Sequence, residues 1–346
     1  MIYFVAPDLQ RPSGGVRTIY RCVDLLNAVQ HAAVVLHSHA GFRCEWFDHD
    51  TPIVYPELRV TADDVIVIPE QLSGKFAAIA PGVPKVVFNQ NAYRTFRFLD
   101  EKAADELPDH PDLVAFLAVS EDNRRLLARA FPTVPVCRYH HCIDPEVFHP
   151  AATPPGRVIT TIPRKRRNDY TELLGILERR HALEGWTIDE VDGRSEGDVG
   201  AALRRSALFV SLARAEGFGL PAAEALASGC HVIGFHGMGG RELFRPPYAQ
   251  TIEDGDVAGL AAAVEAFVRD YDARADALRR QGLDAARQVH ATYSRQHATA
   301  DLVECLALVR EPRVPTEAVV TRSSLAGEHW VRTQLRRRLH QLARRL

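Results

Sequence analysis

The sequence lacks several features that mark common functional classes. No apolar run approaches the ~18–20 residues that a membrane-spanning helix needs, and residues 112–119 are typical of the longest. Residues 1–7 carry no basic region, so they predict a first strand rather than a signal peptide. Net charge is also small, because 42 Lys+Arg face 44 Asp+Glu for a formal total of −2. Nucleic-acid-binding domains are normally strongly basic, so these absences favour a cytoplasmic protein that acts on other partners.

Cysteine pairs at metal-binding spacing are also missing. Six cysteines are scattered along the chain without a CxxC pair, at positions 22, 44, 137, 142, 230 and 305. In a chain of this length they are typical of reduced cytosolic thiols rather than of a disulfide framework. Residues 137–142, CRYHHC, crowd four possible ligands into one segment, but no second half follows at the spacing of a zinc site. We therefore expect no resident metal.

The order of apolar and amphipathic stretches predicts an α/β fold. Short apolar runs alternate with longer amphipathic stretches such as residues 16–29, which is the pattern of buried strands between helices. The predicted strands are residues 2–6, 33–37, 65–68, 85–88, 116–119, 157–162, 187–191, 207–212 and 231–235. A chain of 346 residues has the length of about two domains. The sequence therefore predicts two doubly wound, Rossmann-like domains.

Breaks in this periodicity predict the domain boundaries. Residues 148–156 are rich in proline and interrupt both kinds of pattern. We expect an N-terminal domain over residues 1–150 and a C-terminal domain over residues 151–310. The last helix of the second domain, about residues 294–309, could cross back to the first. Residues 311–346 are expected to form a linker and a C-terminal tail.

One segment, residues 208–229, carries the strongest chemical signal. Its sequence, LFVSLARAEGFGLPAAEALASG, predicts a strand, a loop with two glycines, and a helix that begins near Pro221 and stops at Gly229. A helix N-terminus behind a glycine loop presents free N–H groups and a positive dipole end, which suit a phosphate. Glu216 and Glu224 bracket this point, and a carboxylate can accept hydrogen bonds from two hydroxyls of a diol.

This segment resembles the E-x7-E signature of the GT-B glycosyltransferases, specifically the retaining family GT4, or glycosyltransferase group 1. Other stretches resemble further motifs of the family in the same order: Asp8 with Gly14 and Gly15, residues 119–121, 143–150, 237–242 and 253–260. The resemblance covers most of the chain. It implies a GT-B fold, in which two Rossmann-like domains face a central cleft. It also implies a nucleotide-sugar donor held mainly by the C-terminal domain.

The resemblance implies roles for individual residues. Glu224 would bind the ribose hydroxyls, and Glu216 would lie beside the donor sugar. Backbone N–H groups of the loop between them would contact the sugar and the diphosphate. Further substrate contacts are expected from the N-terminal glycine loop, and from His140 or His141, whose segment faces the cleft in GT-B proteins. The loop residues are Gly217, Phe218, Gly219 and Leu220, and the N-terminal glycines are Gly14 and Gly15.

A basic run follows the strand predicted at residues 157–162. Negative charge develops on a leaving diphosphate, and Arg164 and Lys165 are our candidates to stabilise it. Lys165 is one of only four lysines among the 42 basic residues, which suggests that a point charge is needed there. Family members carry an Arg and a Lys about five residues apart, whereas here the basic residues are consecutive, so an exposed basic turn is the alternative. Asp48 and Asp50 have the spacing of a metal-binding acid pair, but we interpret them as part of a solvated loop.

The residues after the strand at 85–88 depart from the family. Many GT4 enzymes have a histidine near this point, whereas this chain has Asn89, Gln90 and Asn91. Amides can orient hydroxyls but cannot take a proton at neutral pH, which favours substrate contacts and a front-face, substrate-assisted route over a protein base. A similar amide pattern occurs in transferases for bacterial surface polysaccharides.

The end of the chain has a separate character. Residues 330–346 contain six arginines and no acidic residue. At about 100° per residue, Val331 and four leucines fall within an arc of roughly 80°, which predicts a basic amphipathic helix. Such a helix could dock on an anionic membrane beside a lipid-linked acceptor. It could equally pack on the protein's own N-terminal domain or on a second subunit.

Taken together, the sequence predicts a retaining, metal-independent glycosyltransferase without a cofactor. It would move a sugar from a nucleotide-diphosphate sugar to a glycan or lipid-linked glycan, in bacterial surface-polysaccharide or lipopolysaccharide synthesis. We expect a cytoplasmic enzyme, peripheral on the inner face of the membrane if the tail binds lipid. Two alternatives are a GT-B nucleotide-sugar epimerase and a non-catalytic donor-binding or scaffold subunit.

Overall fold

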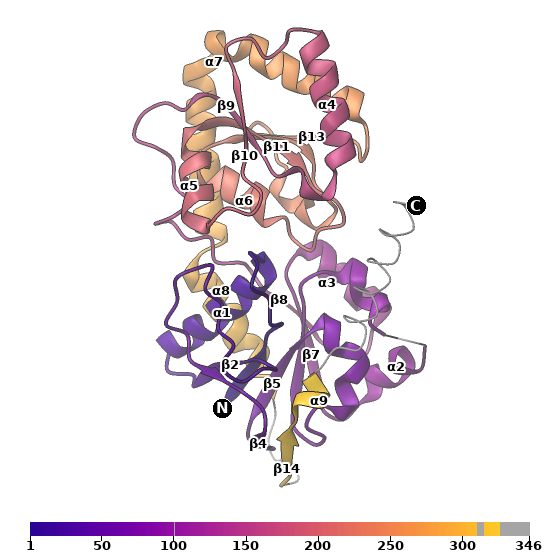
Figure 1. Cartoon of the computed structure of the whole chain (residues 1–346). Helices are drawn as coiled ribbons and strands as arrows, with labels where there is room; N and C mark the ends of the chain where they lie inside the picture. Colours follow the sequence, from indigo (N-terminus) through magenta and orange to yellow (C-terminus); the bar gives the residue numbers. More distant parts are fainter. Residues whose placement is uncertain (100, 310–314, 326–346) are drawn as a thin grey trace, which may run out of the picture.

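The computed structural model describes residues 1–99, 101–309 and 315–325. Figure 1 shows two α/β domains stacked on one another, the N-terminal one below and the C-terminal one above. Each domain is built on a parallel sheet whose strands run into loops at the junction between the domains. This confirms the α/β class and the two Rossmann-like units predicted from the sequence. The amphipathic helix predicted at residues 330–346 lies outside the described residues.

The N-terminal sheet has seven parallel strands in the order β3-β2-β1-β5-β6-β7-β8. All residues of β1, β5 and β6 are buried, since elements cover both faces, and this explains why these strands appear in the sequence as unbroken apolar runs. The strands are β1 (Ile2–Val5), β2 (Ala33–Leu36), β3 (Ile53–Val54), β5 (Val65–Pro69), β6 (Lys85–Asn89), β7 (Leu113–Ala118) and β8 (Val136–Arg138).

Helices and 3-10 turns follow these strands. The amphipathic stretch predicted at 16–29 is α1, and α3 is capped by Ser120, whose Oγ accepts from the N–H of Asn123 at 3.0 Å. The helical elements of this domain are α1 (Gly14–Ala28), η1 (Glu70–Ala78), η2 (Ala92–Arg97), α2 (Glu101–Glu106), η3 (Leu107–Asp109) and α3 (Glu121–Ala130).

The C-terminal sheet has five parallel strands in the order β10-β9-β11-β12-β13. Its strands are β9 (Gly156–Thr161), β10 (Thr187–Glu190), β11 (Ser206–Leu212), β12 (His231–Phe235) and β13 (Ala249–Thr251). Its helical elements are η4 (Pro163–Lys165), α4 (Arg167–Arg179), α5 (Glu196–Arg205), α6 (Leu220–Ala227), η5 (Gly239–Leu243) and α7 (Val257–Thr292). Among the described residues, no helix combines the length and apolar character that a membrane span requires.

The chain passes between the domains twice. After β8 it rises into the C-terminal domain, and after α7 it returns as α8 (Arg295–Leu306), the helix expected at about 294–309. This helix packs against α1 and β8 of the N-terminal domain. One apolar cluster runs through the junction and includes Tyr139, Phe218 and Tyr293.

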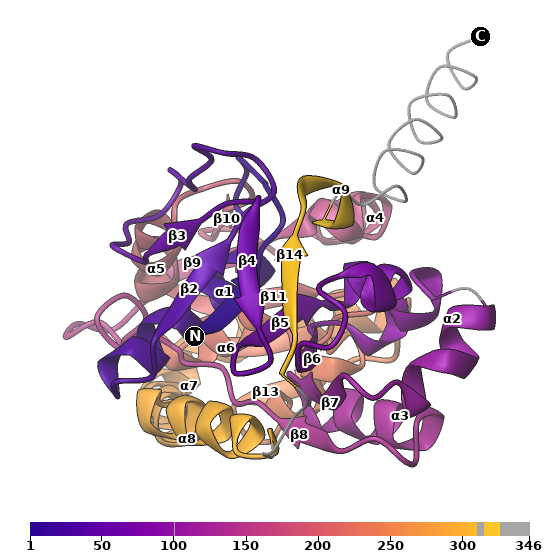
Figure 2. The ribbon, with the colours of Figure 1, turned by 90° about the horizontal axis from the view of Figure 1, so that it is seen from below.

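The segment after α8 differs from the expectation of a linker. Residues Glu317–Val320 form β14, which pairs antiparallel with β4 (Leu58–Thr61), and Arg322–Leu325 form α9. Figure 2 shows β14 beside β4 on the lower surface of the N-terminal domain. Val320 is fully buried and belongs, with Val60, to an apolar cluster of the N-terminal domain. Its side chain is therefore part of the core, which is not expected of a linker residue. Residues 315–325 are therefore part of the N-terminal domain.

Candidate functional site

The site lies where the loop after β11 meets the first turn of α1 and the loop after β6. The contact is too close for side chains: a Cβ on Gly217 would lie 1.8 Å from the carbonyl oxygen of Gln90. A Cβ on Gly14 would likewise lie 2.8 Å from Leu220 Cδ1. The glycines expected in the two domains are thus brought together, and Gly217 is required because the opposite atom belongs to the backbone of Gln90.

Two helix N-termini point into this junction. α1 begins at Gly14, α6 begins at Leu220, and neither helix has an acidic residue in its first turn. Gly219 caps α6 with φ +95°, a left-handed conformation that suits glycine. The free N–H groups and the positive dipole ends of two helices together make a setting for an anionic group such as a diphosphate.

Lys165 and Glu216 form an ion pair at the edge of this junction. Lys165 Nζ donates to Glu216 Oε1 at 2.5 Å, with 33% and 21% of the two side chains exposed. The Glu216 backbone is fixed by its N–H, which donates to the Gly237 carbonyl at 2.7 Å. Two of the three residues predicted to act on the donor sugar and its diphosphate, Lys165 and Glu216, are therefore neighbours and remain accessible.

The other basic residues of the run face elsewhere. Arg166 points inward, where Nε donates to the Ala213 carbonyl at 3.0 Å and the guanidinium lies over the Phe235 ring. Arg164 is 55% exposed and lies 3.7 Å from Asp192. Lys165 thus pairs with Glu216, whereas Arg164 lies beside Asp192. Arg164 therefore agrees with the alternative interpretation, an exposed basic turn.

The three amide residues after β6 separate into different environments. Asn91 Nδ2 donates to the Ala215 carbonyl at 2.7 Å and so joins the two domains. Gln90 Nε2 donates to the Gly15 carbonyl at 3.0 Å. Asn89 differs from the expected substrate contact, because its side chain is fully buried and bonds to Thr95 Oγ1 at 2.6 Å within the N-terminal domain.

His140 also differs from its predicted place. Its Nδ1 lies 2.9 Å from Asp301 of α8, so the side chain is turned toward that helix instead of the glycine loop. Its neighbour His141 is the buried one, with its ring 4.6 Å from that of Phe218. Burial holds the pKa of His141 well below its usual value, so this imidazole is neutral.

Two residues near the site were not found from the sequence. Glu70, at the carboxyl end of β5, is fully buried and accepts from the Gln90 N–H at 3.2 Å. Burial raises the pKa of Glu70 to about 7. Arg17 on α1 contacts Glu224, which is itself buried. A single Glu or Arg beside a glycine carries no recognisable motif, so only the fold reveals these contacts.

Neither carboxylates nor thiols gather into a metal site in the described part of the chain. No group of three or more His, Cys, Asp or Glu side chains is arranged to hold an ion there. Asp48 and Asp50 are exposed in the loop before β3, in agreement with their interpretation as solvated residues.

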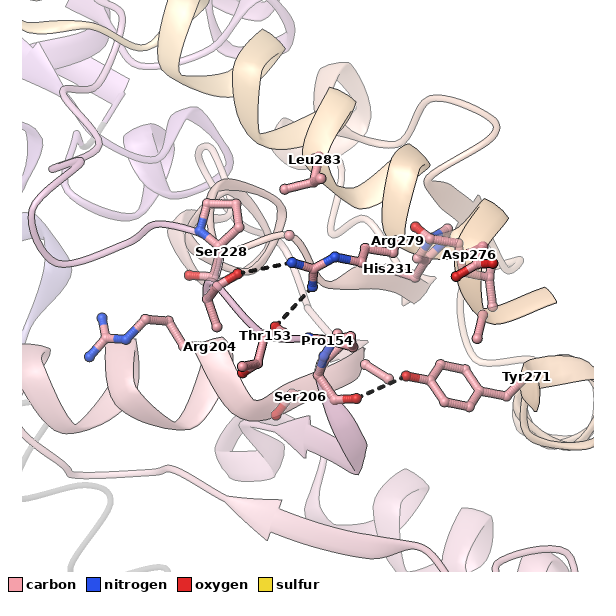
Figure 3. A pocket seen from close by; sticks show the side chains of 17 residues that line it. Thr153, Pro154, Arg204, Ser206, Ser228, His231, Tyr271, Asp276, Arg279 and Leu283 are labelled. Carbon is pink, nitrogen blue, oxygen red and sulfur yellow. Dashed lines mark hydrogen bonds between the residues drawn. The ribbon is translucent and has the colours of Figure 1, made fainter. Parts of the chain in front are cut away.

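Two hollows flank the junction. A cleft of about 840 Å³ lies between α1, the loop at residues 45–49 and the loop at residues 193–197. A smaller cavity of about 80 Å³ lies behind the C-terminal domain, beside the first passage between domains. There Arg279 of α7 donates to the carbonyls of Thr153 at 2.8 Å and Ala151 at 3.4 Å (Figure 3). This second cavity is on the connecting segment, away from the paired Lys165 and Glu216.

Comparison with known proteins agrees with this geometry. Residues 190–282, which include β11, the glycine loop and α6, match the family model of the glycosyl transferases group 1. The C-terminal domain is a group 1 glycosyltransferase domain. A relative named alpha-1,6-glucosyltransferase, from Actinobacillus pleuropneumoniae serotype 7, is 27% identical over 231 residues, or 63% of this chain and 68% of the relative.

Solved structures show that the two-domain arrangement of this chain is the GT-B fold. Sucrose-phosphate synthase from Thermosynechococcus elongatus superposes with a TM-score of 0.63 at 12% identity, over 88% of this chain and 98% of that one. HepE from Anabaena, solved with UDP-glucose, superposes with a TM-score of 0.64 at 13% identity, over 88% and 99%. The predicted resemblance to the group 1 glycosyltransferases and the predicted GT-B fold are both confirmed.

Proposed function

We propose that this protein is a retaining glycosyltransferase that uses a nucleotide-diphosphate sugar as donor. One observation carries the proposal: the Lys165–Glu216 pair lies beside two convergent helix N-termini, each contributed by a different domain. Those N-termini supply positive potential for a diphosphate, and Glu216 supplies hydrogen-bond acceptors for a sugar. In this proposal Glu224, one turn into α6, binds the ribose hydroxyls.

The side chains on the N-terminal side of the junction support the retaining route that we propose. The amides of Gln90 and Asn91 occupy the N-terminal side of the junction, and they offer no base at neutral pH. In the route that we propose, the bond from the anomeric carbon to the diphosphate oxygen breaks as the acceptor oxygen attacks from the same face. The acceptor proton passes to the departing phosphate oxygen. Lys165 and the helix N-termini stabilise the charge that develops on the diphosphate.

The acceptor that we propose is a glycan or a lipid-linked glycan of a bacterial surface polysaccharide. The relative named alpha-1,6-glucosyltransferase has a name that denotes an α-linked product. The amide pattern at residues 89–91 resembles that of transferases for bacterial surface polysaccharides, and it supports an acceptor of that class. No metal is needed in this proposal, because Lys165 and two helix dipoles provide the positive charge.

A thermal-shift panel tests the proposal directly. The melting temperature is measured with uridine, guanosine, adenosine and thymidine diphosphates and with the corresponding nucleotide-diphosphate sugars. A ligand that binds the folded state raises the melting temperature. We expect at least one of these nucleotides to raise it, and no shift from any would contradict the proposed donor. Glu216→Ala should then lose most sugar transfer, whereas full biological function in that variant would favour a scaffold subunit. Product analysis separates transfer from epimerisation.

For the C-terminal tail we propose reversible docking on an anionic membrane surface. The support is its sequence alone, with six arginines and an apolar stripe over residues 330–346. Co-sedimentation with phosphatidylglycerol vesicles should fall with rising salt and disappear when residues 326–346 are deleted. Absence of binding at low salt would favour packing on the protein or on a second subunit.

A further inference from the structure

Two arginines on α1 contact two glutamates of the C-terminal domain. Arg17 Nη2 lies 2.5 Å from Glu224 Oε1, and Arg17 Nη1 lies 3.0 Å from Glu196 Oε1. Arg21, one turn further along α1, donates to the same Glu196 oxygen at 2.6 Å. These four side chains form one ionic cluster, which we call the α1 arginine cluster, and it joins the two domains.

The α1 arginine cluster is shielded from solvent. The side chains of Arg17 and Glu224 are only 10% and 7% exposed. Burial raises the pKa of Glu224, the positive charge of Arg17 lowers it, and the nearby Glu196 raises it again. The net effect is a raised pKa, and the charge of Arg17 is the largest influence that favours the ionised carboxylate. A buried carboxylate that loses such a partner is left with an uncompensated charge.

Arg17 and Glu224 lie close to the two helix N-termini that we propose to bind the diphosphate. Arg17 is three residues after the start of α1 at Gly14, and Glu224 is four residues after the start of α6 at Leu220. Both are therefore about one helical turn, roughly 5 Å, beyond the two N-termini. In a nucleotide sugar the ribose is directly bonded to the diphosphate, so it would lie within reach of this pair.

We propose that Arg17 is a positioning residue of the donor site, which holds the Glu224 carboxylate toward the ribose hydroxyls while the two domains are closed. The inference rests on the proposed donor. A carboxylate has about four lone-pair sites, so a bond from Arg17 to Oε1 leaves capacity for both hydroxyls of a ribose. Arg21 supports the arrangement by neutralising Glu196, which would otherwise repel Glu224. Because Arg17 belongs to the N-terminal domain, donor binding and domain closure share this contact and favour one another.

The test compares nucleotides that have or lack the ribose hydroxyls. The probes are uridine, guanosine and adenosine diphosphates and their 2′,3′-dideoxy counterparts, titrated by calorimetry against the full chain. Thymidine diphosphate, which has only the 3′-hydroxyl, is titrated beside its 3′-deoxy counterpart. We expect the wild type to bind its preferred nucleotide about 10-fold or more tighter than the dideoxy form, as for a hydrogen bond to a charged group. Arg17→Met should bind both forms with the weak affinity that the wild type shows for the dideoxy form.

Controls distinguish positioning from a loosened interface. Arg138 of β8 makes another interdomain pair, 2.5 Å from Glu242 Oε1, so Arg138→Met removes a similar contact without touching Glu224. We expect that variant to keep its discrimination between the two forms. Arg17→Lys retains the charge but cannot bridge two carboxylates, so it should discriminate between the two forms to an intermediate degree. This variant also keeps the test valid if Arg17→Met fails to fold.

Three outcomes overturn the inference while leaving the proposed donor intact. The first is an Arg17→Met variant that binds both forms more weakly by the same factor. The second is a wild type that binds a nucleotide without discriminating the dideoxy form. The third is an Arg138→Met variant that loses discrimination as fully as Arg17→Met. A wild type that binds none of the four nucleotides instead contradicts the proposed function itself.

Discussion

Lys165 donates to Glu216 across 2.5 Å, so the cation proposed for the diphosphate and the carboxylate proposed for the sugar hold one another before any ligand is present. Both side chains are partly exposed, and neither forms a second ion pair within the described part of the chain. A donor placed at this junction would therefore meet an ammonium and a carboxylate that are already adjacent. Such preorganisation lowers the cost of arranging charges during reaction.

Lys165→Ala should reduce kcat for sugar transfer by about 100-fold or more, because it removes positive charge from the leaving diphosphate. Lys165→Arg should retain part of the activity, since the charge remains although its geometry changes. Arg164→Ala is the matched control, because that side chain is 55% exposed and faces Asp192. Steady-state kinetics with the donor varied would contradict this assignment if the Arg164 variant were the more impaired.

Removal of divalent metal should leave transfer unchanged. The positive charge that we assign to the diphosphate comes from Lys165 and from the N-termini of α1 and α6. Initial rates are measured after dialysis against EDTA and again after addition of Mg²⁺ or Mn²⁺. A rate that depends on either ion would show that the diphosphate has another partner.

Gly217→Ala should abolish productive closure of the site. The added Cβ would lie 1.8 Å from the Gln90 carbonyl oxygen, a backbone atom that has little freedom to move. We expect a large loss of kcat together with weaker donor binding, because the two domains could no longer meet at this point. Gly175→Ala is the control: no heavy atom lies within 4 Å of its added Cβ, and alanine favours the helix α4. Comparable losses in both variants would contradict the expectation.

The buried carboxyl group of Glu70 should make the free energy of unfolding depend on pH. Burial raises its pKa from 4.5 to about 7, so the folded state keeps a proton that the unfolded state has lost. The contribution of Glu70 to the free energy of unfolding therefore falls as pH rises from about 4.5 to about 7, and is constant above that. Glu70→Gln removes this dependence. Its stability relative to the wild type should rise across this window by on the order of 3 kcal/mol. Urea denaturation at pH 5 and pH 8 measures the difference, and an equal effect at both would contradict it.

Deletion of residues 315–346 should lower the melting temperature by several degrees more than deletion of residues 326–346 does. The longer deletion removes β14, with Val320 fully buried and Leu325 5% exposed, and leaves β4 without its partner. Differential scanning calorimetry of the two truncated proteins makes the comparison. Equal melting temperatures would show that β14 does not contribute to stability.

The central strands and the glycine loop could be predicted because their signals are local. β1, β5, β6 and β11 are buried along their whole length, which produces continuous apolar runs, and the loop at residues 216–220 carries glycine, proline and acid at fixed offsets. Lys165 could also be predicted from the sequence, because lysine is scarce in this chain and the surrounding basic residues are arginines.

What the sequence could not supply depends on contacts between distant segments. β14 pairs with β4 across more than 250 residues, and its four residues have no strong alternation of their own. The bond between Arg17 and Glu224 spans 207 positions. His140 and His141 are adjacent in sequence, and only the packing of α8 and Phe218 determines which imidazole faces which neighbour.

The two passages between domains lie side by side, since the N–H of Ile143 donates to the carbonyl of Tyr293 at 2.9 Å. The C-terminal domain is thus an insertion whose entry and exit are joined, and the N-terminal domain resumes after it with α8 and β14. A body attached at two neighbouring points can rotate about the line through them but cannot slide freely. Opening of the site would therefore be a rotation, in which contacts far from this axis separate by a greater distance than those close to it.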